Sequence, residues 1–385
     1  AGTHDLFPVH PLTARALAAD PLIAGADAPG ALTDAGAVLA PRPYLQVRPT
    51  LSTRTVAVAG QPDQHLKLPL PASTLGLRNR RSIAPATLAD GALVGRTLAA
   101  ILAAEAAEVG DSPLNGLLLA DETEYAHAGR ADLGYLLRRF PPGLERCQVV
   151  PVAALTAPAP GGRLTPVLER LAERLAGRPA EAGWLGKPGR SVGAGWLGKH
   201  CDVLAFACDY FRLVFAVAVA LLVRHGIALE SHQQNAALVV GPGEPLRLLV
   251  KDFDGTLLRP DRNPEAAGLT DPRMLTDSDE ALADVFVTIT VHLCVGAVAF
   301  GLARAGAAPL EKLLAAARRA LTQALDTEGD APAAKLLRGR VLEADRLAGK
   351  SMITAGTLTA KEHTGAADIN KHYAAVGPNY LKENR

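Results

Sequence analysis

The chain is 385 residues long, which is enough for two or three domains with cores of their own. Hydrophobic residues make up 49%, charged residues 21%, and the formal net charge is +1, so the electrostatics do not favour nucleic acid or an anionic membrane as main partner. The four cysteines lack CxxC spacing, which predicts buried free thiols in a reducing cytoplasm. No start methionine or signal peptide opens the chain, and we expect the later part of a longer protein.

The first half of the chain is expected to contain short strands and longer helices. A helical segment should lie within 1–35, and four apolar runs between Pro and Gly predict strands: Ala37–Leu39, Tyr44–Val47, Thr55–Val58 and Leu66–Leu70. Apolar residues then recur near every 3.6 positions, which predicts helices over 92–140 and 163–177. The Gly-rich stretch 178–200 contains AGWLGK twice; we expect a surface connection, with a mobile loop over the site as the alternative.

The early strands carry a group of hydroxyl and cationic side chains: Ser52, Arg54, Thr55, Lys67 and Arg78. A polyphosphate needs this mixture, because Lys supplies a point charge, Arg a planar fork, and hydroxyls satisfy the remaining oxygens. For any single member of the group, a solvated strand edge is the alternative. Together they predict an anion site.

Residues 226–256 are the stretch around which we expect the chain to be organised. A long apolar helix over about 201–224 leads to the runs Ala236–Val240 and Leu246–Val250. The turn Gly241-Pro242-Gly243 lies between the two runs and predicts an antiparallel hairpin.

Polar residues stand at both ends of this hairpin. Period-2 alternation places Glu230, His232 and Gln234 on one face of an extended entry segment that ends at Asn235. Asp252 and Asp254 follow the exit strand. If the strands pair, the two groups meet at one end of the sheet, where they could hold a divalent cation and a phosphate.

The second half is expected to be mainly helical. Val285–Ala303 has 19 residues without a formal charge, and we expect a buried helix or strand pair there, with a membrane span as the alternative. Val214–Val223 is too short to span. A polar loop over 262–281, two amphipathic helices within 309–350 and an irregular last 30 residues complete the prediction.

Asp252-Phe253-Asp254-Gly255-Thr256, after an apolar run, resembles the first motif of haloacid-dehalogenase-type phosphatases. In that family the first Asp is a nucleophile and the second an acid/base. Such a Mg²⁺-dependent phosphatase needs a parallel doubly wound sheet downstream, where this sequence predicts mostly helices. A polar β-turn is the third interpretation of the motif.

Taken in order, five motifs resemble the IucA/IucC family of NRPS-independent siderophore (NIS) synthetases: Phe7-Pro8-Val9-His10-Pro11, Ser52-x-Arg54-Thr55, Lys67-Leu68-x-Leu70 with Thr74-x-x-x-Arg78, Glu230-x-His232-x-Gln234-Asn235 and Lys251-Asp252-Phe253-x-Gly255. The resemblance implies an α+β, hand-like fold with antiparallel sheets in the nucleotide cleft and a mostly helical C-terminal part. Residues 1–145 would be the fingers-like part, and 146–385 the palm-like part with a helical, FhuF-like region.

The resemblance also implies an activity, which is ATP-dependent joining of a citrate-like polycarboxylate to an amine or alcohol through an acyl-adenylate. Matching positions would hold ATP (Ser52, Arg54, Thr55, Lys67, Arg78, His232 and Gln234) and Mg²⁺ (Glu230, Asn235 and Asp252), with His232, Arg78 and Lys67 as catalytic groups. His10 would be structural or substrate-facing. His292 could line the acceptor pocket, although a hydrogen-bonded core histidine is the favoured interpretation. A homodimer is expected by resemblance.

Two departures from the family pattern qualify the resemblance. Lys251-Asp252 stands where the family usually has Arg-Asp, so the charge is kept and the bidentate fork is lost. Family members are usually longer at the N-terminus, where further residues help to bind the carboxylate. A non-catalytic ligand-binding relative is therefore a third hypothesis beside the synthetase and the phosphatase.

Overall fold

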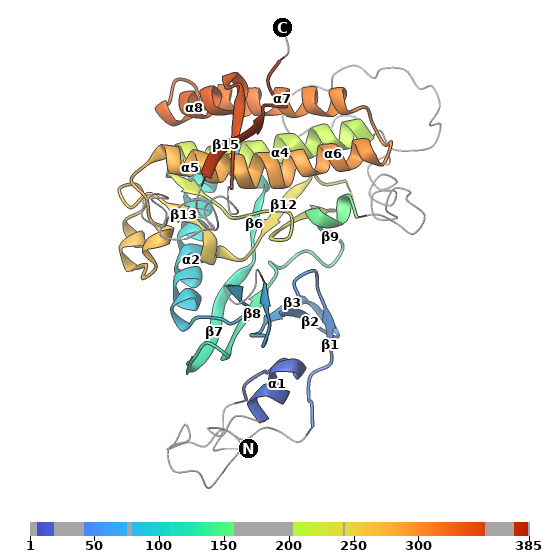
Figure 1. The fold of residues 1–385 in the computed structure, drawn as a ribbon, viewed down its shortest axis with the longest axis vertical. Coiled ribbons are helices and arrows are strands. Elements are labelled where there is room, and N and C mark those ends of the chain that lie inside the picture. The colour runs from blue at the N-terminus through green and yellow to red at the C-terminus, as the bar shows by residue number, and fades with distance from the viewer. Residues whose placement is uncertain are drawn as a thin grey trace. The chain divides into compact units, whose positions relative to one another are not determined.

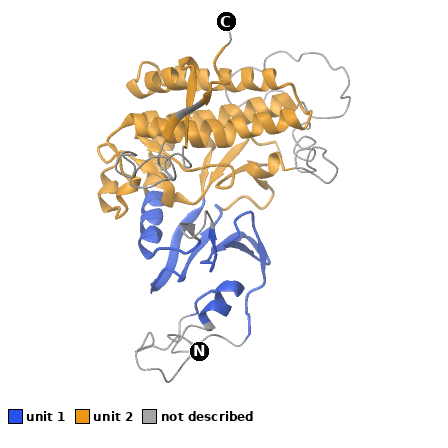
Figure 2. Cartoon of the chain, viewed as in Figure 1, with its two compact units in different colours: residues 1–96, 120–141 blue, residues 97–119, 142–385 orange. Residues whose placement is uncertain are grey.

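A computed structural model describes residues 6–18, 42–74, 79–108, 110–157, 203–241, 243–350 and 373–383. The chain divides into two compact units, shown in Figure 2: unit 1 comprises residues 1–96 and 120–141, and unit 2 comprises 97–119 and 142–385. Unit 1 is built on an antiparallel sheet, and unit 2 combines a small sheet with most of the helices. The predicted α+β class is confirmed, while the hand-like description and the boundary at 145 stay predictions.

The sheet of unit 1 has five antiparallel strands in the order β1-β2-β3-β8-β7, which can be followed in Figure 1. Their bounds are Val47–Pro49 (β1), Thr55–Val58 (β2), Gln61–Lys67 (β3), Leu133–Arg139 (β8) and Asp121–Arg130 (β7). Alternation puts Val56, Leu66 and Leu68 into one apolar cluster. A second cluster joins Leu136 to Leu88 on helix α2 (Pro85–Glu108). Short strands β4 (Ser73–Thr74) and β5 (Asn79–Arg80) also pair.

The sheet of unit 2 contains the predicted hairpin. Strand β11 (Ala236–Val240) pairs antiparallel with β12 (Arg247–Val250), in a register that places Ala236 opposite Val250. On the other side of β11 lies β9 (Gln148–Pro151), while β6 (Leu117–Leu119) runs parallel to β12. Every residue of β11 is buried, as expected for a central strand covered on both faces.

The helices of unit 2 supply most of its core. Helix α4 (Val203–His225) packs on α7 (Leu310–Thr327) and on the π-helical segment η7 (Phe286–Gly296), which α5 (Asp279–Val285) and α6 (Ala297–Arg304) flank. After α8 (Pro332–Leu337) a second π-helical segment, Arg338–Glu343, leads to β14 (Arg346–Lys350). Strand β14 pairs antiparallel with β15 (Tyr373–Pro378). Both the long apolar helix and the buried helix over Val285–Ala303 are therefore confirmed.

By length and composition alone, three helical stretches of the described chain could cross a membrane: Pro85–Glu108, Val203–His225 and Asp279–Arg304. Their apolar windows are 39%, 78% and 78% buried within the protein. Val214–Val223 lies inside a helix of 23 residues, so the shortness of that run does not argue against a span. The absence of a membrane partner stays a prediction.

Arg224, in the last turn of α4, joins elements from distant parts of unit 2. Its guanidinium lies 3.0 Å from Glu105 of α2 and 2.9 Å from Glu328, which follows α7. The side chains of these glutamates are only 11% and 7% exposed. Carboxylates that far from water need a partner, and Arg224 supplies it for both.

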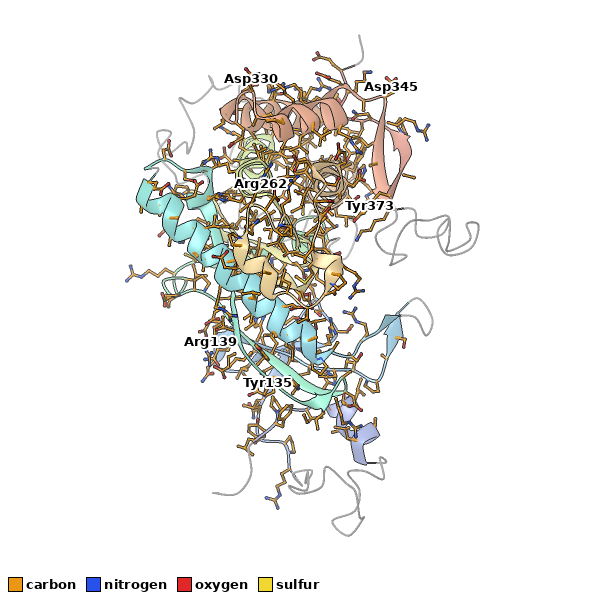
Figure 3. All side chains as sticks on the ribbon, turned by 90° about the vertical axis from the view of Figure 1, so that its left-hand side faces the viewer. Tyr135, Arg139, Arg262, Asp330, Asp345 and Tyr373 are labelled. Carbon is orange, nitrogen blue, oxygen red and sulfur yellow. The ribbon has the colours of Figure 1, made fainter. Side chains whose placement is uncertain are left out.

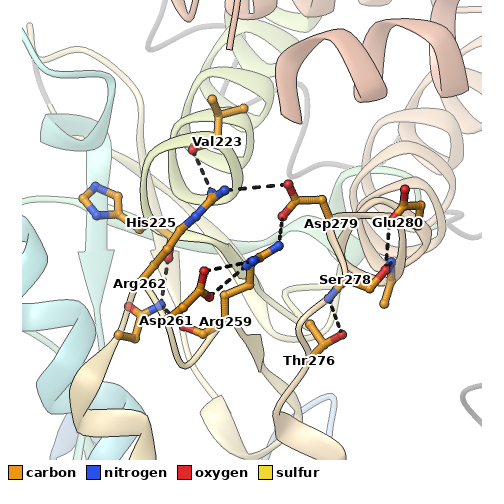
Figure 4. A network of polar contacts seen from close by, with 11 residues as sticks. Val223, His225, Arg259, Asp261, Arg262, Thr276, Ser278, Asp279 and Glu280 are labelled. Atoms are coloured by element: carbon orange, nitrogen blue, oxygen red, sulfur yellow. Dashed lines mark hydrogen bonds and ion pairs between the residues drawn. The ribbon is translucent and has the colours of Figure 1, made fainter. Parts of the chain in front are cut away.

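A second polar network, drawn in Figure 4, fixes the segment after β13 (Leu257–Leu258) to α4 and α5. Arg259 donates to Asp261 at 2.9 Å and to Asp279 at 2.8 Å. Asn263 donates to the carbonyl of His225 at 2.8 Å. The predicted polar loop over 262–281 therefore contains hydrogen-bonded short turns, Pro264–Gly268 and Pro272–Met274, before α5 begins.

Several local predictions were wrong. The helix expected over 92–140 ends at Glu108, because the later apolar residues lie in β6 and β8 and pair with other strands. A short apolar run gives the same signal in a buried strand as in a buried helix, so the sequence alone did not separate the two. The last 30 residues contain β15, so they are not wholly irregular. Strands β1 and β3 begin and end at other residues than expected.

Other predictions concern the cysteine side chains or positions outside the described residues. Of the cysteines, Cys294 is buried, whereas Cys147 and Cys208 are only half-buried, and these three thiols are free. Cys201, the strand Ala37–Leu39, the helix 163–177 and the connection 178–200 lie outside the described residues.

Candidate functional site

The mouth of the β11–β12 hairpin carries the site in unit 2. The amide of Lys251 donates to the carbonyl of Asn235 at 3.1 Å, which extends the pairing by one residue beyond the strands. The Lys251 Nζ donates to the carbonyl of Gln234 at 2.8 Å. The hairpin therefore brings the polar residues before β11 and those after β12 to the same end of the sheet, as predicted.

The entry segment is a turn and not the extended strand expected from its alternation. The amides of Asn235 and Ala236 donate to the carbonyl of His232 at 2.7 and 3.0 Å, and the Asn235 side chain donates to the carbonyl of Glu230 at 3.3 Å. Asn235 is buried, with 6% of its surface exposed. Local hydrogen bonds from Asn thus replace the strand pairing that alternation predicted.

His232 lies between charged groups of both signs. Burial lowers the pKa of its imidazole from the ordinary value, more strongly than the carboxylates of Glu230 and Asp252 raise it, and Lys251 and Lys350 also lower it. The ring is therefore neutral at pH 7. Its Nδ1 accepts a hydrogen bond from the amide of Gln234 at 3.3 Å, so the proton belongs on Nε2.

Asp252 has an unusual backbone. Its φ of 69° and ψ of 68° lie in the left-handed region, and it is the only non-glycine residue of the described chain with a positive φ. Such a conformation costs roughly 1–3 kcal/mol and collects at functional sites. The short helical turn Phe253–Gly255 begins directly after it, with Phe253 fully buried.

Glu230 is confined at both carboxylate oxygens. Its Oε1 lies 3.3 Å from the Nζ of Lys350. An ideal Cβ added to Gly255 would lie 2.0 Å from its Oε2, so the carboxylate occupies the space that any other residue at 255 would fill. The Gly255 of the quoted motif therefore has a local reason, which is the close approach of Glu230.

The basic group lies in unit 1. Thr55 and Lys67 are directly opposed in the β2–β3 pair and are each 4% exposed. Arg54 donates to the carbonyl of Ser82 at 2.6 Å, and Ser52 is half-buried in the turn before β2. Arg78 lies outside the described residues. Lys67 is thus a buried cation of the sheet and not a solvated edge residue.

His10 and His292 have defined hydrogen bonds. The Nδ1 of His10 accepts from the amide of Leu12 at 3.2 Å, which caps helix α1 (Pro11–Ala18), and burial lowers its pKa. His292, on η7, contacts the hydroxyl of Tyr380 through Nδ1 at 2.9 Å and the carbonyl of Ala348 through Nε2 at 2.8 Å. Burial lowers its pKa as well. Both ring nitrogens of His292 are engaged, as in a core histidine.

A pocket of mainly apolar lining borders the turn that carries Glu230. Its polar lining residues are Tyr210, Ser231, Thr290 and Cys294, and the rest come chiefly from α4, β10 (Ile227–Ala228), β11 and β12. The Cys294 thiol donates to the carbonyl of Ser231 at 3.1 Å, and burial raises its pKa to about 12. The protonated thiol of Cys294 on η7 therefore forms a hydrogen bond to the turn that carries Glu230.

Sequence patterns missed two residues of this site, Lys350 and Tyr373. They are opposed in the β14–β15 pair and reach Glu230 from the far end of the chain. The charge of Glu230 contributes, after burial, to raising the pKa of the Tyr373 phenol. A lone Lys at the end of a short strand gives no sequence signal, and β15 itself was not predicted.

Comparisons with known proteins match both parts of the chain. The IucA / IucC family model matches residues 1–157, and a model described as a ferric iron reductase FhuF-like transporter matches residues 204–364. The aerobactin synthase of Escherichia coli is 39% identical over 56 residues, which are 14% of this chain and 10% of that protein. The first 157 residues are thus similar to the IucA/IucC family.

Solved structures of siderophore enzymes have the same fold. ATP-bound aerobactin synthetase IucA from Klebsiella pneumoniae matches with a TM-score of 0.70 at 18% identity, covering 98% of this chain and 62% of that one. The petrobactin biosynthesis protein AsbB from Bacillus anthracis matches with a TM-score of 0.62 at 18% identity, covering 87% and 53%. The chain matches about a tenth of the curated relative's length and 53–62% of these two structures.

The phosphatase interpretation of Asp252 and Asp254 is wrong for the sheet that the structure shows. A haloacid-dehalogenase-type site needs its first Asp at the end of a strand in a parallel doubly wound sheet. Here β12 pairs antiparallel with β11 and parallel only with β6, and the described elements that follow it are mainly helical. Asp254 lies inside a short helical turn.

The donors at the hairpin mouth fit a Mg²⁺ ion that is bound only in part by the protein. Within the described ranges no group of three or more His, Cys, Asp or Glu side chains could hold a metal, so a complete protein cage is absent there. Mg²⁺, however, is usually bound by one or two carboxylates together with substrate phosphates and water. Glu230 and Asp252, with the amide of Asn235, match that incomplete donor set.

Proposed function

We propose that the protein is an ATP-dependent siderophore synthetase that joins a citrate-like polycarboxylate to an amine or alcohol through an acyl-adenylate. The match of residues 1–157 to the IucA/IucC family model and a fold similar to that of an ATP-bound aerobactin synthetase support this. The hairpin mouth also supports it, because the Lys251 amide donates to the Asn235 carbonyl at 3.1 Å, and this pairing brings the segment from Glu230 to Asn235 to the same end of the sheet as Asp252. A cytoplasmic location and a homodimer are part of the proposal.

The proposed reaction has two steps. A carboxylate oxygen of the substrate bonds to the α-phosphorus of ATP while the bond to pyrophosphate breaks. The amine or alcohol then attacks the acyl carbon, AMP leaves with the bonding electrons, and the proton of the nucleophile passes to solvent. The chain needs to supply positioning and charge stabilisation for both steps, and no covalent nucleophile of its own.

Each group of residues has a role in this proposal. Ser52, Arg54, Thr55, Lys67, Arg78 and Gln234 would bind the ATP phosphates. His232, neutral and protonated on Nε2, would donate a hydrogen bond to an anionic oxygen, so it acts as a donor and not as a base. Glu230, Asn235 and Asp252 would hold Mg²⁺, which when bound neutralises phosphate charge. Catalytic roles are assigned to His232, Arg78 and Lys67 and a substrate-facing position to His10, whereas both ring nitrogens of His292 are engaged within the protein, so it is assigned no substrate contact.

The test is citrate-dependent exchange of pyrophosphate into ATP, with a panel of other polycarboxylates beside it. We expect exchange in the unmodified protein, a loss of at least about 100-fold in Asp252→Asn, and little change in Asp254→Asn. Binding of ATP·Mg without exchange for any carboxylate would favour the ligand-binding relative. Absence of ATP·Mg binding would overturn the proposal itself.

A further inference from the structure

Lys350 places an ammonium group against the carboxylate that is assigned to a divalent cation. Its Nζ lies 3.3 Å from Glu230 Oε1, and the two residues are 120 positions apart in sequence. The side chains are 23% and 36% exposed, so the pair is accessible to water and to ions.

Hydrogen bonds on both strands fix the position of Lys350. Strand β14 contacts η7, where His292 Nε2 donates to the carbonyl of Ala348, two residues before Lys350. Tyr380, which follows β15, contacts Nδ1 of the same histidine. Tyr373, labelled in Figure 3, is paired with Lys350 at the start of β15. The β14–β15 pair is thus anchored to η7 through His292.

Glu230 cannot retreat from this ammonium group toward Gly255. Its Oε2 already lies within 2.0 Å of the position that a Cβ at 255 would take, so that side is closed by backbone. Oε1, the oxygen that faces Lys350, is therefore the one whose cation partner can be exchanged.

We propose that Lys350 is a resident counter-ion of Glu230, whose ammonium group a divalent cation must displace before Glu230 can bind it. The inference rests on the proposed function in assigning Glu230 to the cation. Displacement leaves a Lys charge beside a dication, and this repulsion weakens binding of the cation alone. Anionic phosphates or carboxylates of the substrates would relieve the repulsion, so the exchange favours cation binding together with substrate.

The test is the affinity of the purified protein for Mn²⁺, without nucleotide or carboxylate, measured by the electron paramagnetic resonance signal of free Mn²⁺. We expect Lys350→Met to bind Mn²⁺ about 3- to 10-fold more tightly, since a partly exposed ion pair is worth up to about fivefold and like-charge repulsion is also removed. Lys350→Arg, which keeps the charge, should keep the original affinity. In a Glu230→Gln background, Lys350→Met should no longer change it.

Lys335→Met is the matched control, because Lys335 pairs with Asp330 at an exposed position and the net charge changes by the same amount. It should leave Mn²⁺ affinity unchanged. Unchanged or weaker binding in folded Lys350→Met, or tighter binding in Lys350→Arg, overturns the exchange. The Mn²⁺ titration contains neither ATP nor a carboxylate, so it does not depend on the synthetase assignment. If that assignment fails, pyrophosphate exchange will be absent while Lys350→Met still binds Mn²⁺ more tightly than the unmodified protein.

Discussion

The substitution Gly255→Ala should move the carboxylate of Glu230 while leaving the stability of the fold nearly unchanged. A methyl group at 255 would lie 2.0 Å from Glu230 Oε2, whereas ordinary contacts begin at 3.4 Å, so this oxygen must move by about 1.4 Å. The nearest atom is the free end of a flexible side chain, and the Glu230 Cβ, at 3.1 Å, needs to shift by only a few tenths of an ångström. We expect less than about 1 kcal/mol of lost stability.

The effect on catalysis should be much larger. A displacement of about 1 Å in a positioned group can lower a rate by about 100-fold, and Gly255→Ala should lower citrate-dependent pyrophosphate exchange by that factor. Urea unfolding measured beside the exchange assay gives the two quantities in one preparation. Gly377→Ala on β15 is the control, since no atom lies within 4 Å of its added Cβ.

A double-mutant cycle tests whether the loss acts through Glu230. If it does, Gly255→Ala should cost almost nothing further in a Glu230→Ala background, because the displaced group is already gone. Full additivity of the two losses, or exchange in Gly255→Ala within about threefold of the unmodified protein, refutes the reasoning.

Three further predictions concern stability. Asn379→Ala should lower the free energy of unfolding by about 2–4 kcal/mol, because its buried amide donates to two carbonyls and accepts from two backbone amides. In the same urea titration, Asn115→Ala at an exposed position should change the free energy of unfolding little. Arg224→Met should cost about 3–5 kcal/mol, because it removes a guanidinium from two largely buried glutamates, of which Glu105 keeps its contacts to Ser112 and His225. Arg212→Met at a more exposed pair should cost under about 1 kcal/mol. Burial lowers the pKa of His292, so the unfolded chain binds a proton at this residue more readily than the folded chain does. The melting temperature should therefore fall as the pH drops below about 6.5, and in His292→Gln it should depend less on pH over this range.

The hairpin was predictable because its signals are local. Two apolar runs around a Gly-Pro-Gly turn specify pairing, and pairing alone brings the residues before β11 next to Asp252. Lys350 was not predictable, since its approach to Glu230 depends on the pairing of β14 with β15 and on their packing against η7. Gly255 was part of the quoted motif, but the sequence did not show why glycine is needed there. The structure does, because the carboxylate of Glu230, from another segment, fills the space that a side chain at 255 would occupy.

Asp252 combines a carboxylate with a left-handed backbone, and substitutions can separate the two. Asn tolerates φ of 69° at least as well as Asp, Gly tolerates it best, and Ala poorly. Stability should therefore be retained in Asp252→Asn and Asp252→Gly and fall by about 1 kcal/mol in Asp252→Ala. Pyrophosphate exchange should be lost in all three, because each lacks the carboxylate. If activity instead follows stability, with Asn and Gly active and Ala inactive, Asp252 serves the turn and not the cation. That outcome would leave Glu230 as the one carboxylate assigned to the cation and remove the donor set on which the magnesium assignment depends.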